Sequence, residues 1–382
     1  MGAKVIPLGV VPTPAVAYLT RYYKADAGVV ISASHNPCEY NGIKFFNSDG
    51  YKLSDGIENE IESYILGEKA IEELPTHGKV GYVSANHNAV EDYVAFAVST
   101  IDCRLDGMKI AVDCANGASY ETAFKALNKL GANVEAIHNT PDGVNINHMC
   151  GSTHMESLQA YVTSIGADIG IAFDGDADRM LAVDENGNLI DGDQIMAACA
   201  KFMRDNGTLK QNTLVATVMS NLGLFMAGEK IGINIPRTKV GDRYVLEEML
   251  AKGYNIGGEQ SGHIIFLDHN TTGDGLVSAL QFLSVLKKTG MKASEAASIV
   301  TVMPQVLRNA VVKLENKNSY MENEEIAAAC KALEDEFAGE GRVLIRPSGT
   351  EPLVRVMIEG KDEEYITKKA EELAELIEKI LG

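Results

Sequence analysis

Three aspartates alternate with other residues in the segment Asp174-Gly-Asp-Ala-Asp-Arg179. Alternate residues of an extended backbone point the same way, so the carboxylates of Asp174, Asp176 and Asp178 would face one another. Such charges repel strongly unless a cation lies between them, and carboxylate oxygens suit Mg²⁺. The segment therefore predicts one magnesium ion per chain, and a solvated acidic turn is the alternative.

An EF-hand calcium loop is a rival interpretation, because Glu185 follows the aspartates at the twelfth loop position. Two observations count against it. Arg179 stands at the sixth position, where that loop needs a glycine. The preceding segment Ile169-Gly-Ile-Ala-Phe173 is typical of a strand rather than of an entering helix.

Ser34 lies in the polar segment Ser32-Ala-Ser-His-Asn-Pro37, directly after the apolar run Gly28–Ile31. A serine near a proline is usually a turn residue. Beside a divalent ion, however, a serine oxygen or a phosphoserine can carry a phosphoryl group, because the metal neutralises charge on the transferring group. The sequence contains no G-x-x-x-x-G-K-[ST] motif, so nothing indicates a nucleotide donor.

The segment Arg346-Pro-Ser-Gly-Thr-Glu-Pro352 has the composition of an anion site. Ser348, Gly349 and Thr350 can offer backbone N–H groups and hydroxyls, and the Arg346 guanidinium can bind two phosphate oxygens. Arg355 could add a second guanidinium. A tight turn between two strands is the alternative interpretation.

A fourth polar loop, Gly257-Gly-Glu-Gln-Ser-Gly-His263, offers groups that bind sugar hydroxyls, namely Glu259, Ser261 and His263. The chemistry of these residues leaves a second interpretation open, in which the histidine is hydrogen-bonded for structural reasons at the end of a strand.

Each of the four loops follows a short apolar run of the kind that forms a strand. Ligand sites of parallel α/β sheets gather at the carboxyl ends of the strands. The loops are therefore expected to meet in one central cleft.

The elements that would position these loops alternate between strands and helices, which predicts α/β layers. The alternation runs through Lys4–Leu8, Thr13–Ala25 and Gly28–Ile31, then Lys109–Val112, Tyr120–Leu130 and Asn133–Ile137, then Thr213–Thr217, Gly223–Ile231 and Asn234–Pro236. The C-terminal part differs, with strands at Val306–Leu314, Arg342–Ile345 and Leu353–Ile358 and helices at Asn323–Phe337 and Glu363–Ile380. The second helix is amphipathic, with Ile366, Leu373, Leu376, Ile377 and Ile380 on one face. We predict three α/β domains with mixed parallel sheets at 1–88, 89–190 and 191–302, the first incomplete, and an α+β domain at 303–382.

The net charge and the composition of the chain disfavour some classes of binding partner. The 382 residues carry a formal net charge of −19, which disfavours nucleic acid and anionic membrane surfaces as general partners. Six widely spaced cysteines, no membrane-length apolar run and no signal peptide favour a reduced, cytoplasmic protein. A small anionic substrate is compatible with this net charge only where local basic residues and backbone amides bind it.

The four loops, in this order, resemble the active-site loops of the α-D-phosphohexomutase superfamily. Asn41-Gly-Ile-Lys44 adds to the first loop. Within the superfamily the chain resembles the phosphoglucosamine mutase family, on the strength of Gln260 and of Asn145-Ile-Asn147, Cys150-Gly-Ser-Thr-His154 and Thr217-Val-Met-Ser-Asn-Leu-Gly223.

The resemblance implies an isomerase-class enzyme that interconverts glucosamine 6-phosphate and glucosamine 1-phosphate, towards UDP-N-acetylglucosamine, through a phosphoserine and a bisphosphate. A homodimer is compatible with it. The implied metal ligands are Ser34, Asp174, Asp176 and Asp178; the implied catalytic residues are Ser34, Lys44, Arg179 and His263. The implied substrate-binding residues are Lys239, Glu259, Ser261, Arg346, Ser348, Gly349, Thr350 and Arg355.

The family's opening motifs, Gly-Thr-Asp-Gly-x-Arg-Gly and Gly-Arg-Asp-Thr-Arg, do not occur in this sequence. The expectation is therefore an N-terminally truncated chain whose first domain is incomplete, with a catalytically silent fragment as one alternative. A phosphomannomutase or phosphoglucomutase is the alternative within the class, and Gln260 argues against it. A serine-based metal phosphohydrolase is disfavoured by the single aspartate cluster without further histidine-rich ligand groups.

Overall fold

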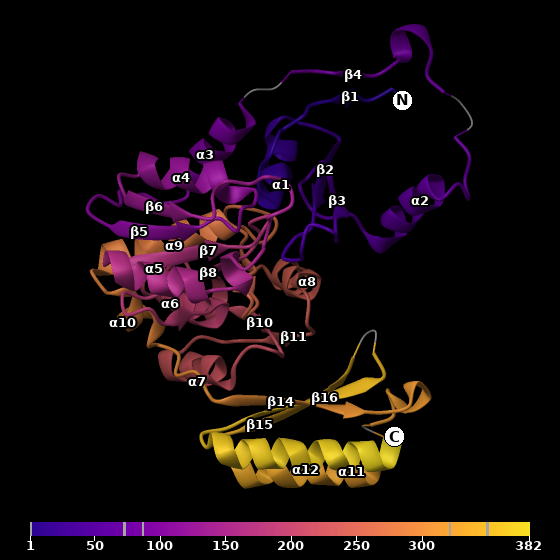
Figure 1. The fold of residues 1–382 in the computed structure, drawn as a ribbon, viewed down its shortest axis with the longest axis vertical. Helices are drawn as coiled ribbons and strands as arrows, with labels where there is room; N and C mark the ends of the chain where they lie inside the picture. The colour runs from indigo at the N-terminus through magenta and orange to yellow at the C-terminus, as the bar shows by residue number, and fades with distance from the viewer. Residues whose placement is uncertain (1, 72–73, 86–87, 321, 349–350) are drawn as a thin grey trace. The chain divides into compact units, whose positions relative to one another are not determined.

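The computed structural model describes residues 2–71, 74–85, 88–320, 322–348 and 351–382. It divides into two compact units (Figure 1). One comprises Met1–Ser220 and Gly228–Ile299, and the other comprises Asn221–Ala227 and Val300–Gly382.

The N-terminal part of the first unit holds two small sheets. Strand β1 (Lys4–Val5) pairs in parallel with β4 (Tyr82–Val83), and β2 (Ala27–Ser32) pairs antiparallel with β3 (Gly42–Asn47). Helix α1 (Thr13–Tyr22) contacts the β2–β3 hairpin. The remaining helices of this part are α2 (Asp55–Ile65) and the short η1 (His77–Lys79).

The strand predicted at Lys4–Leu8 was too long. Strand β1 ends at Val5, and both of its residues are exposed. Pro7 lacks the N–H group that a strand between two neighbours must donate, which explains the early end.

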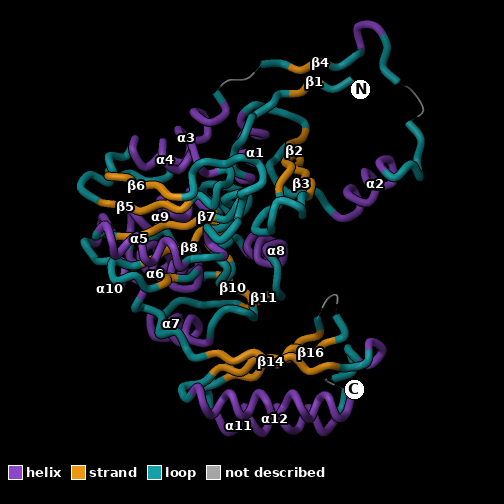
Figure 2. Tube along the Cα trace, in the orientation of Figure 1, coloured by secondary structure: helices purple, strands orange, loops and turns teal. Residues whose placement is uncertain are grey.

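The second α/β part is a five-stranded sheet in the order β6-β5-β7-β8-β9. Strands β6, β5 and β7 are parallel, β8 pairs antiparallel with β7, and β9 pairs antiparallel with β8. Helices α4 and α5 contact this sheet, and Figure 2 shows the strands and helices by type. The elements are α3 (Ala89–Ser99), β5 (Lys109–Asp113), α4 (Ser119–Lys129), β6 (Asn133–Ile137), η2 (Gly151–Thr153), α5 (Glu156–Ile165), β7 (Ile169–Phe173), β8 (Met180–Val183) and β9 (Leu189–Ile190).

The third α/β part is a four-stranded sheet in the order β11-β10-β12-β13. Its elements are α6 (Gly192–Asp205), η3 (Lys210–Asn212), β10 (Val215–Thr217), β11 (Arg237–Thr238), α8 (Asp242–Lys252), β12 (Ile256–Gly258), β13 (Ile264–Phe266), α9 (Gly275–Thr289) and α10 (Ala293–Ala297). Helix α7 (Leu222–Ile231) begins in the second unit, which includes Asn221–Ala227, and ends in the first. The predicted strand at Asn234–Pro236 was misplaced. Asn234 makes only an isolated bridge to Thr213, and the ladder begins after Pro236, a residue without an N–H donor.

The second unit contains a three-stranded antiparallel sheet with helices α11 and α12 lying along it (Figure 1). Its elements are β14 (Gln305–Val311), η4 (Leu314–Asn316), α11 (Glu324–Phe337), β15 (Arg342–Pro347), β16 (Leu353–Glu359) and α12 (Glu363–Leu381). The predicted apolar face of α12 packs into this core through Ile366, Leu373 and Ile377. The side chain of Asp362 accepts from Tyr365 N and so caps the start of α12.

Within the described parts of the chain, none of the helices combines the length and the apolar composition that a membrane crossing requires.

Candidate active site

The aspartate loop connects β7 to β8 at the carboxyl end of β7. All five residues of β7 are buried, and the loop turns back through a bond of 3.0 Å from Ala177 N to Asp174 O. Asp174, Asp176 and Asp178 are exposed by only 0%, 2% and 4%. Each offers one carboxylate oxygen, and these oxygens lie within 4.8 Å of one another. The structure therefore brings the three predicted carboxylates together in a buried position.

Three buried carboxylate oxygens accept no hydrogen bond from any residue that the structure describes: Asp174 Oδ2, Asp176 Oδ1 and Asp178 Oδ1. Burial, followed by repulsion from Asp178 and Asp176, raises the pKa of Asp174 well above its ordinary value. A divalent cation among these oxygens would satisfy the acceptors and remove the repulsion. The residues present therefore fit a metal ion with oxygen ligands.

Lys44 partly balances this negative charge. Its Nζ lies 2.7 Å from Asp176 Oδ2 and 3.2 Å from Asp178 Oδ2. Burial alone would lower the pKa of Lys44, but attraction to Asp178 and Asp176 outweighs burial and raises it. Lys44 is therefore held as a cation at the edge of the cluster.

Thr13 is a contact that the sequence did not reveal. Its Oγ1 donates to Asp176 Oδ2 over 2.6 Å, and its backbone N–H donates to Asp176 O over 2.9 Å. Thr13 stands at the start of α1 beside Pro12 and Pro14, where a threonine is ordinary, so only the fold distinguishes it.

The Ser34 loop lies against the aspartate loop. Ser34 has a positive φ of 53°, and its N–H donates to Ser32 Oγ over 2.9 Å. Asn147 Nδ2 donates to Ser34 O and to Asn36 O, each over 2.8 Å. A Cβ on Gly175 would lie 2.6 Å from Ser34 O, so the backbones of the two loops are in close contact. The sequence contained the Asn145-Ile-Asn147 motif but gave no sign of this contact.

His263 also faces the aspartates. It is 4% exposed, and its Nε2 lies 4.0 Å from Asp178 Oδ2 and 3.7 Å from Asp242 Oδ2. A Cβ on Gly273 would lie 2.4 Å from His263 Nε2, so only a glycine fits against the ring there. Burial would raise the pKa of Asp242, but attraction to His263 and Lys52 lowers it overall.

The other residues of the sugar loop have mixed surroundings. Glu259 is half-buried, and its Oε1 accepts from Gly241 N over 3.1 Å. Ser261 is exposed, as is Lys239, whose Nζ lies 5.6 Å from the ring centre of Tyr244. Glu259, Ser261 and Lys239 thus lie at or near the surface in the described structure.

Gln260 makes a contact that its sequence context did not indicate. Its Nε2 donates to Asp191 Oδ2 over 3.0 Å, while its backbone carbonyl accepts from Gly192 N. Asp191 is the N-cap of α6 and also accepts from Gln194 N. Gln260 therefore ties the sugar loop to the start of α6.

The residues that were predicted to bind phosphate belong to the second unit. Arg346 on β15 stands directly opposite Arg355 on β16 in the strand register. Burial and the neighbouring Arg355 lower the pKa of Arg346. Arg355 Nη2 lies 3.4 Å from Glu351 Oε2, and Ser348 is buried. Gly349 and Thr350 lie outside the described residues. Two facing guanidinium groups suit an anion of high charge.

Four family models match the chain one after another. They are described as phosphoglucomutase/phosphomannomutase α/β/α domain I at residues 1–72, domain II at 90–187, domain III at 191–303 and the C-terminal domain at 310–376. A phosphoglucosamine mutase of Ruminiclostridium cellulolyticum is 63% identical over 99% of this chain and 84% of its own length. The chain belongs to the phosphoglucosamine mutase group of the phosphoglucomutase/phosphomannomutase family. The predicted resemblance and the isomerase class are confirmed.

Other comparisons agree with this membership. A phosphoglucosamine mutase of Acetivibrio thermocellus is 62% identical over 100% of this chain and 85% of its own length. A phosphoglucomutase/phosphomannomutase family protein of Burkholderia thailandensis has a TM-score of 0.78 at 22% identity, covering 98% of this chain and 83% of that one.

A further structure, the N-acetylphosphoglucosamine mutase of Aspergillus fumigatus in complex with GlcNAc-6P and magnesium, has a TM-score of 0.70. It is 19% identical and covers 97% of this chain and 93% of that one. The predicted fold, with three α/β domains and a C-terminal α+β domain, is confirmed.

Proposed function

We propose that this phosphohexomutase interconverts glucosamine 6-phosphate and glucosamine 1-phosphate through a phosphorylated Ser34 and a bisphosphate intermediate. The observation that carries the proposal is the docking of the Ser34 loop on the buried aspartate loop, through Asn147 and Gly175. A serine held beside clustered carboxylates suits phosphoryl transfer, because the catalytic groups need only be positioned and their charge balanced.

The transfer step exchanges one P–O bond for another. A sugar hydroxyl attacks the phosphorus of phospho-Ser34, the bond from phosphorus to Ser34 Oγ breaks, and a new bond to the sugar oxygen forms. The net proton movement is from the sugar hydroxyl to Ser34 Oγ. We assign Lys44, Arg179 and His263 to charge balance and proton transfer. His263 supports this role because both of its buried ring nitrogens lack hydrogen-bond partners among the described residues.

Asp174, Asp176 and Asp178, together with an oxygen of phospho-Ser34, would hold one Mg²⁺ per chain. When bound, this ion supplies positive charge that stabilises the transferring phosphoryl group. The unpaired carboxylate oxygens of the three aspartates support the assignment.

The sugar and its second phosphate would be bound by residues outside this cluster. Glu259 and Ser261 would bind sugar hydroxyls, with Lys239 nearby. The phosphate that does not react would be held by Arg346, Ser348, Gly349, Thr350 and Arg355. The facing positions of Arg346 and Arg355 support this second assignment.

The substrate is tested by measuring turnover of glucosamine, glucose and mannose 6-phosphates by the purified chain with Mg²⁺ and a priming bisphosphate. We expect the highest kcat/KM for glucosamine 6-phosphate. A higher kcat/KM for either other sugar would overturn the glucosamine assignment. No turnover of any of the three would overturn the proposal that this chain is an active mutase.

A further inference from the structure

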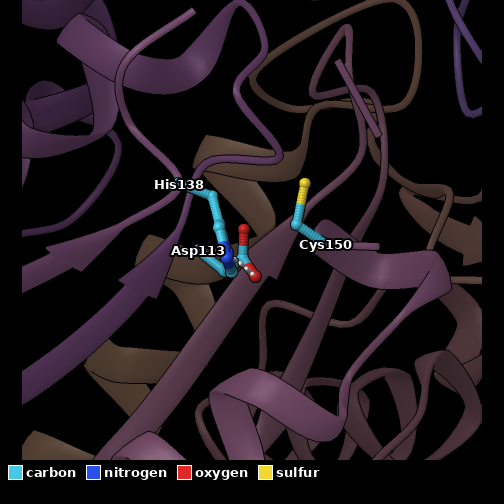
Figure 3. A group of neighbouring side chains, drawn as sticks. All are labelled: Asp113, His138 and Cys150. Atoms are coloured by element: carbon cyan, nitrogen blue, oxygen red, sulfur yellow. Dashed lines mark hydrogen bonds and ion pairs between the residues drawn. The ribbon is translucent and has the colours of Figure 1, made fainter. Parts of the chain in front are cut away.

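A second group of potential metal ligands lies at the carboxyl ends of β5 and β6. Asp113 is the last residue of β5, His138 follows β6 directly, and Cys150 precedes η2. Each offers one ligand atom, and the three atoms lie within 4.8 Å of one another. Figure 3 shows the His138 ring directed at the Asp113 carboxylate, with Cys150 beside the pair. Three segments well separated in the sequence therefore converge on one point.

Two of the three potential ligands are buried, which distinguishes this cluster from a chance group of side chains on the surface. Asp113 and Cys150 are fully buried, while the His138 side chain is 31% exposed. Asp113 Oδ1 accepts from Ala115 N over 2.8 Å, and its Oδ2 lies 2.9 Å from His138 Nδ1. A buried carboxylate needs a nearby positive charge or several donors. The partly exposed His138 leaves a side from which an ion can enter.

The ligand chemistry separates this cluster from the three aspartates. Oxygen-only sites suit Mg²⁺, whereas a set of sulfur, imidazole nitrogen and carboxylate oxygen suits Zn²⁺. Zinc sites with three protein ligands usually keep a fourth position for water. We propose that Asp113, His138 and Cys150 form a second metal site in this protein, which binds Zn²⁺ and is separate from the three-aspartate cluster.

Binding of one Zn²⁺ releases one proton from the protein. The Cys150 thiol releases its proton to the solvent as the sulfur–zinc bond forms, and no electrons are transferred. His138 binds through an unprotonated ring nitrogen. Asp113 binds through one carboxylate oxygen and keeps the bond that its Oδ1 accepts from Ala115 N.

The site adjoins the segment that holds Ser34. Ala115 O, two residues beyond Asp113, accepts from Asn147 N over 2.9 Å. A Cβ on Gly151, the neighbour of Cys150, would lie 2.5 Å from Phe173 O, just before Asp174. Zinc would therefore bind beside the backbone that carries the active-site loops. The proposal rests on the convergence of the Asp113, His138 and Cys150 ligand atoms and not on the proposed mutase reaction.

Cobalt provides a direct test, because Co²⁺ bound by a thiolate has a charge-transfer band that Co²⁺ bound by oxygen lacks. The full chain is first saturated with Mg²⁺ to occupy the three aspartates and is then titrated with Co²⁺. We expect the thiolate band to saturate at one Co²⁺ per chain and to be abolished by one equivalent of Zn²⁺. Absence of the band from the wild-type chain would overturn the proposal and leave Asp113 and His138 as a structural pair.

Variants identify the ligands. Cys150→Ser should abolish the band, whereas Cys114→Ser should keep it, because Cys114 is equally buried and adjacent to Asp113 but outside the cluster. His138→Gln, at a partly exposed position, should weaken Zn²⁺ affinity at least tenfold. Thermal unfolding verifies that each variant is folded. A band that persists in Cys150→Ser, or unchanged Zn²⁺ affinity in His138→Gln, would overturn the assignment.

Discussion

The side-chain nitrogen of Asn147 lies 2.8 Å from the carbonyl oxygen of Ser34, although 113 positions separate the two residues in the sequence. The same nitrogen donates to Asn36 O, so one amide holds the Ser34 loop at two points. Ser34 itself has a positive φ, a conformation that a non-glycine residue keeps only when its surroundings enforce it. Asn147 is therefore a positioning residue for Ser34.

Asn147→Ala should lower kcat by roughly tenfold to a hundredfold while KM changes little. The reason is that a small displacement of a reacting group is costly, whereas substrate binding uses other residues. Asn145→Ala is the matched control, because Asn145 lies in the same segment and bonds to Thr140 O and Asp142 N. Steady-state kinetics give kcat and KM for the two variants. An unchanged kcat in Asn147→Ala would refute the positioning role.

Ser34→Ala should abolish mutase activity and leave the fold nearly intact, because it removes the nucleophilic oxygen but little buried apolar area. Intact mass of the wild-type chain, after incubation with the bisphosphate, should show one added phosphate that Ser34→Ala lacks. Ser48→Ala, an exposed serine in the same part of the chain, should keep both the phosphate and the activity. Normal turnover by Ser34→Ala would rule out the phosphoserine mechanism.

Asp176→Asn should raise the Mg²⁺ concentration needed for half-maximal activity by about tenfold or more and strongly lower kcat. Glu185→Gln is an informative control. Its carboxylate bonds to Ser294 rather than joining the aspartates, whereas an EF-hand would need it as a ligand. We expect Glu185→Gln to leave the Mg²⁺ dependence unchanged. The measurement is mutase activity as a function of Mg²⁺ concentration. The same Mg²⁺ dependence in Asp176→Asn and in the wild type would contradict the metal assignment.

Asp174→Asn should stabilise the metal-free protein near pH 7, with a rise in the unfolding midpoint of about 2 °C or more. A carboxyl with a raised folded-state pKa binds more protons when folded than when unfolded, so stability falls as pH rises past its ordinary value of 3.8. The asparagine avoids this loss, and its advantage should fade below that pH. Calorimetry across pH measures the effect. A lower midpoint at pH 7 for Asp174→Asn would show that burial and repulsion of the Asp174 carboxylate do not destabilise the metal-free protein.

Arg346→Lys should raise KM for the sugar phosphate by roughly tenfold and change kcat less. Lysine keeps the charge but loses the two-pronged guanidinium that matches phosphate. Arg308→Lys is the control on the same sheet, because Arg308 stands opposite Val356 and pairs with Glu371 rather than facing Arg355. The measurement is steady-state kinetics at a fixed Mg²⁺ concentration. A wild-type KM in Arg346→Lys as well as in Arg308→Lys would contradict the role of Arg346 in phosphate binding.

The sequence by itself determined the local features of this protein. The alternation of Asp174, Asp176 and Asp178 after an apolar run predicted clustered carboxylates at the end of a strand, and the spacing of Ile366, Leu373 and Ile377 predicted the buried face of α12. The buried face of α12 follows from the period of the helix, which is set by the backbone over a few residues. The aspartates cluster for a different reason than the extended backbone that was predicted, because their segment forms a turn with a positive φ of 55° at Ala177. Proline marked the places where that reasoning failed, at Pro7 and Pro236.

Only the tertiary structure decided which distant residues meet. Thr13 bonds to Asp176 across 163 positions, Asn147 bonds to Ser34, and His138 and Cys150 join Asp113. None of these contacts has a local pattern, because a hydroxyl, an amide or an imidazole in a loop is equally compatible with solvent. Their partners are set by the order of strands in the sheet and by the crossing of loops at its edge, where packing of the whole core fixes the distances.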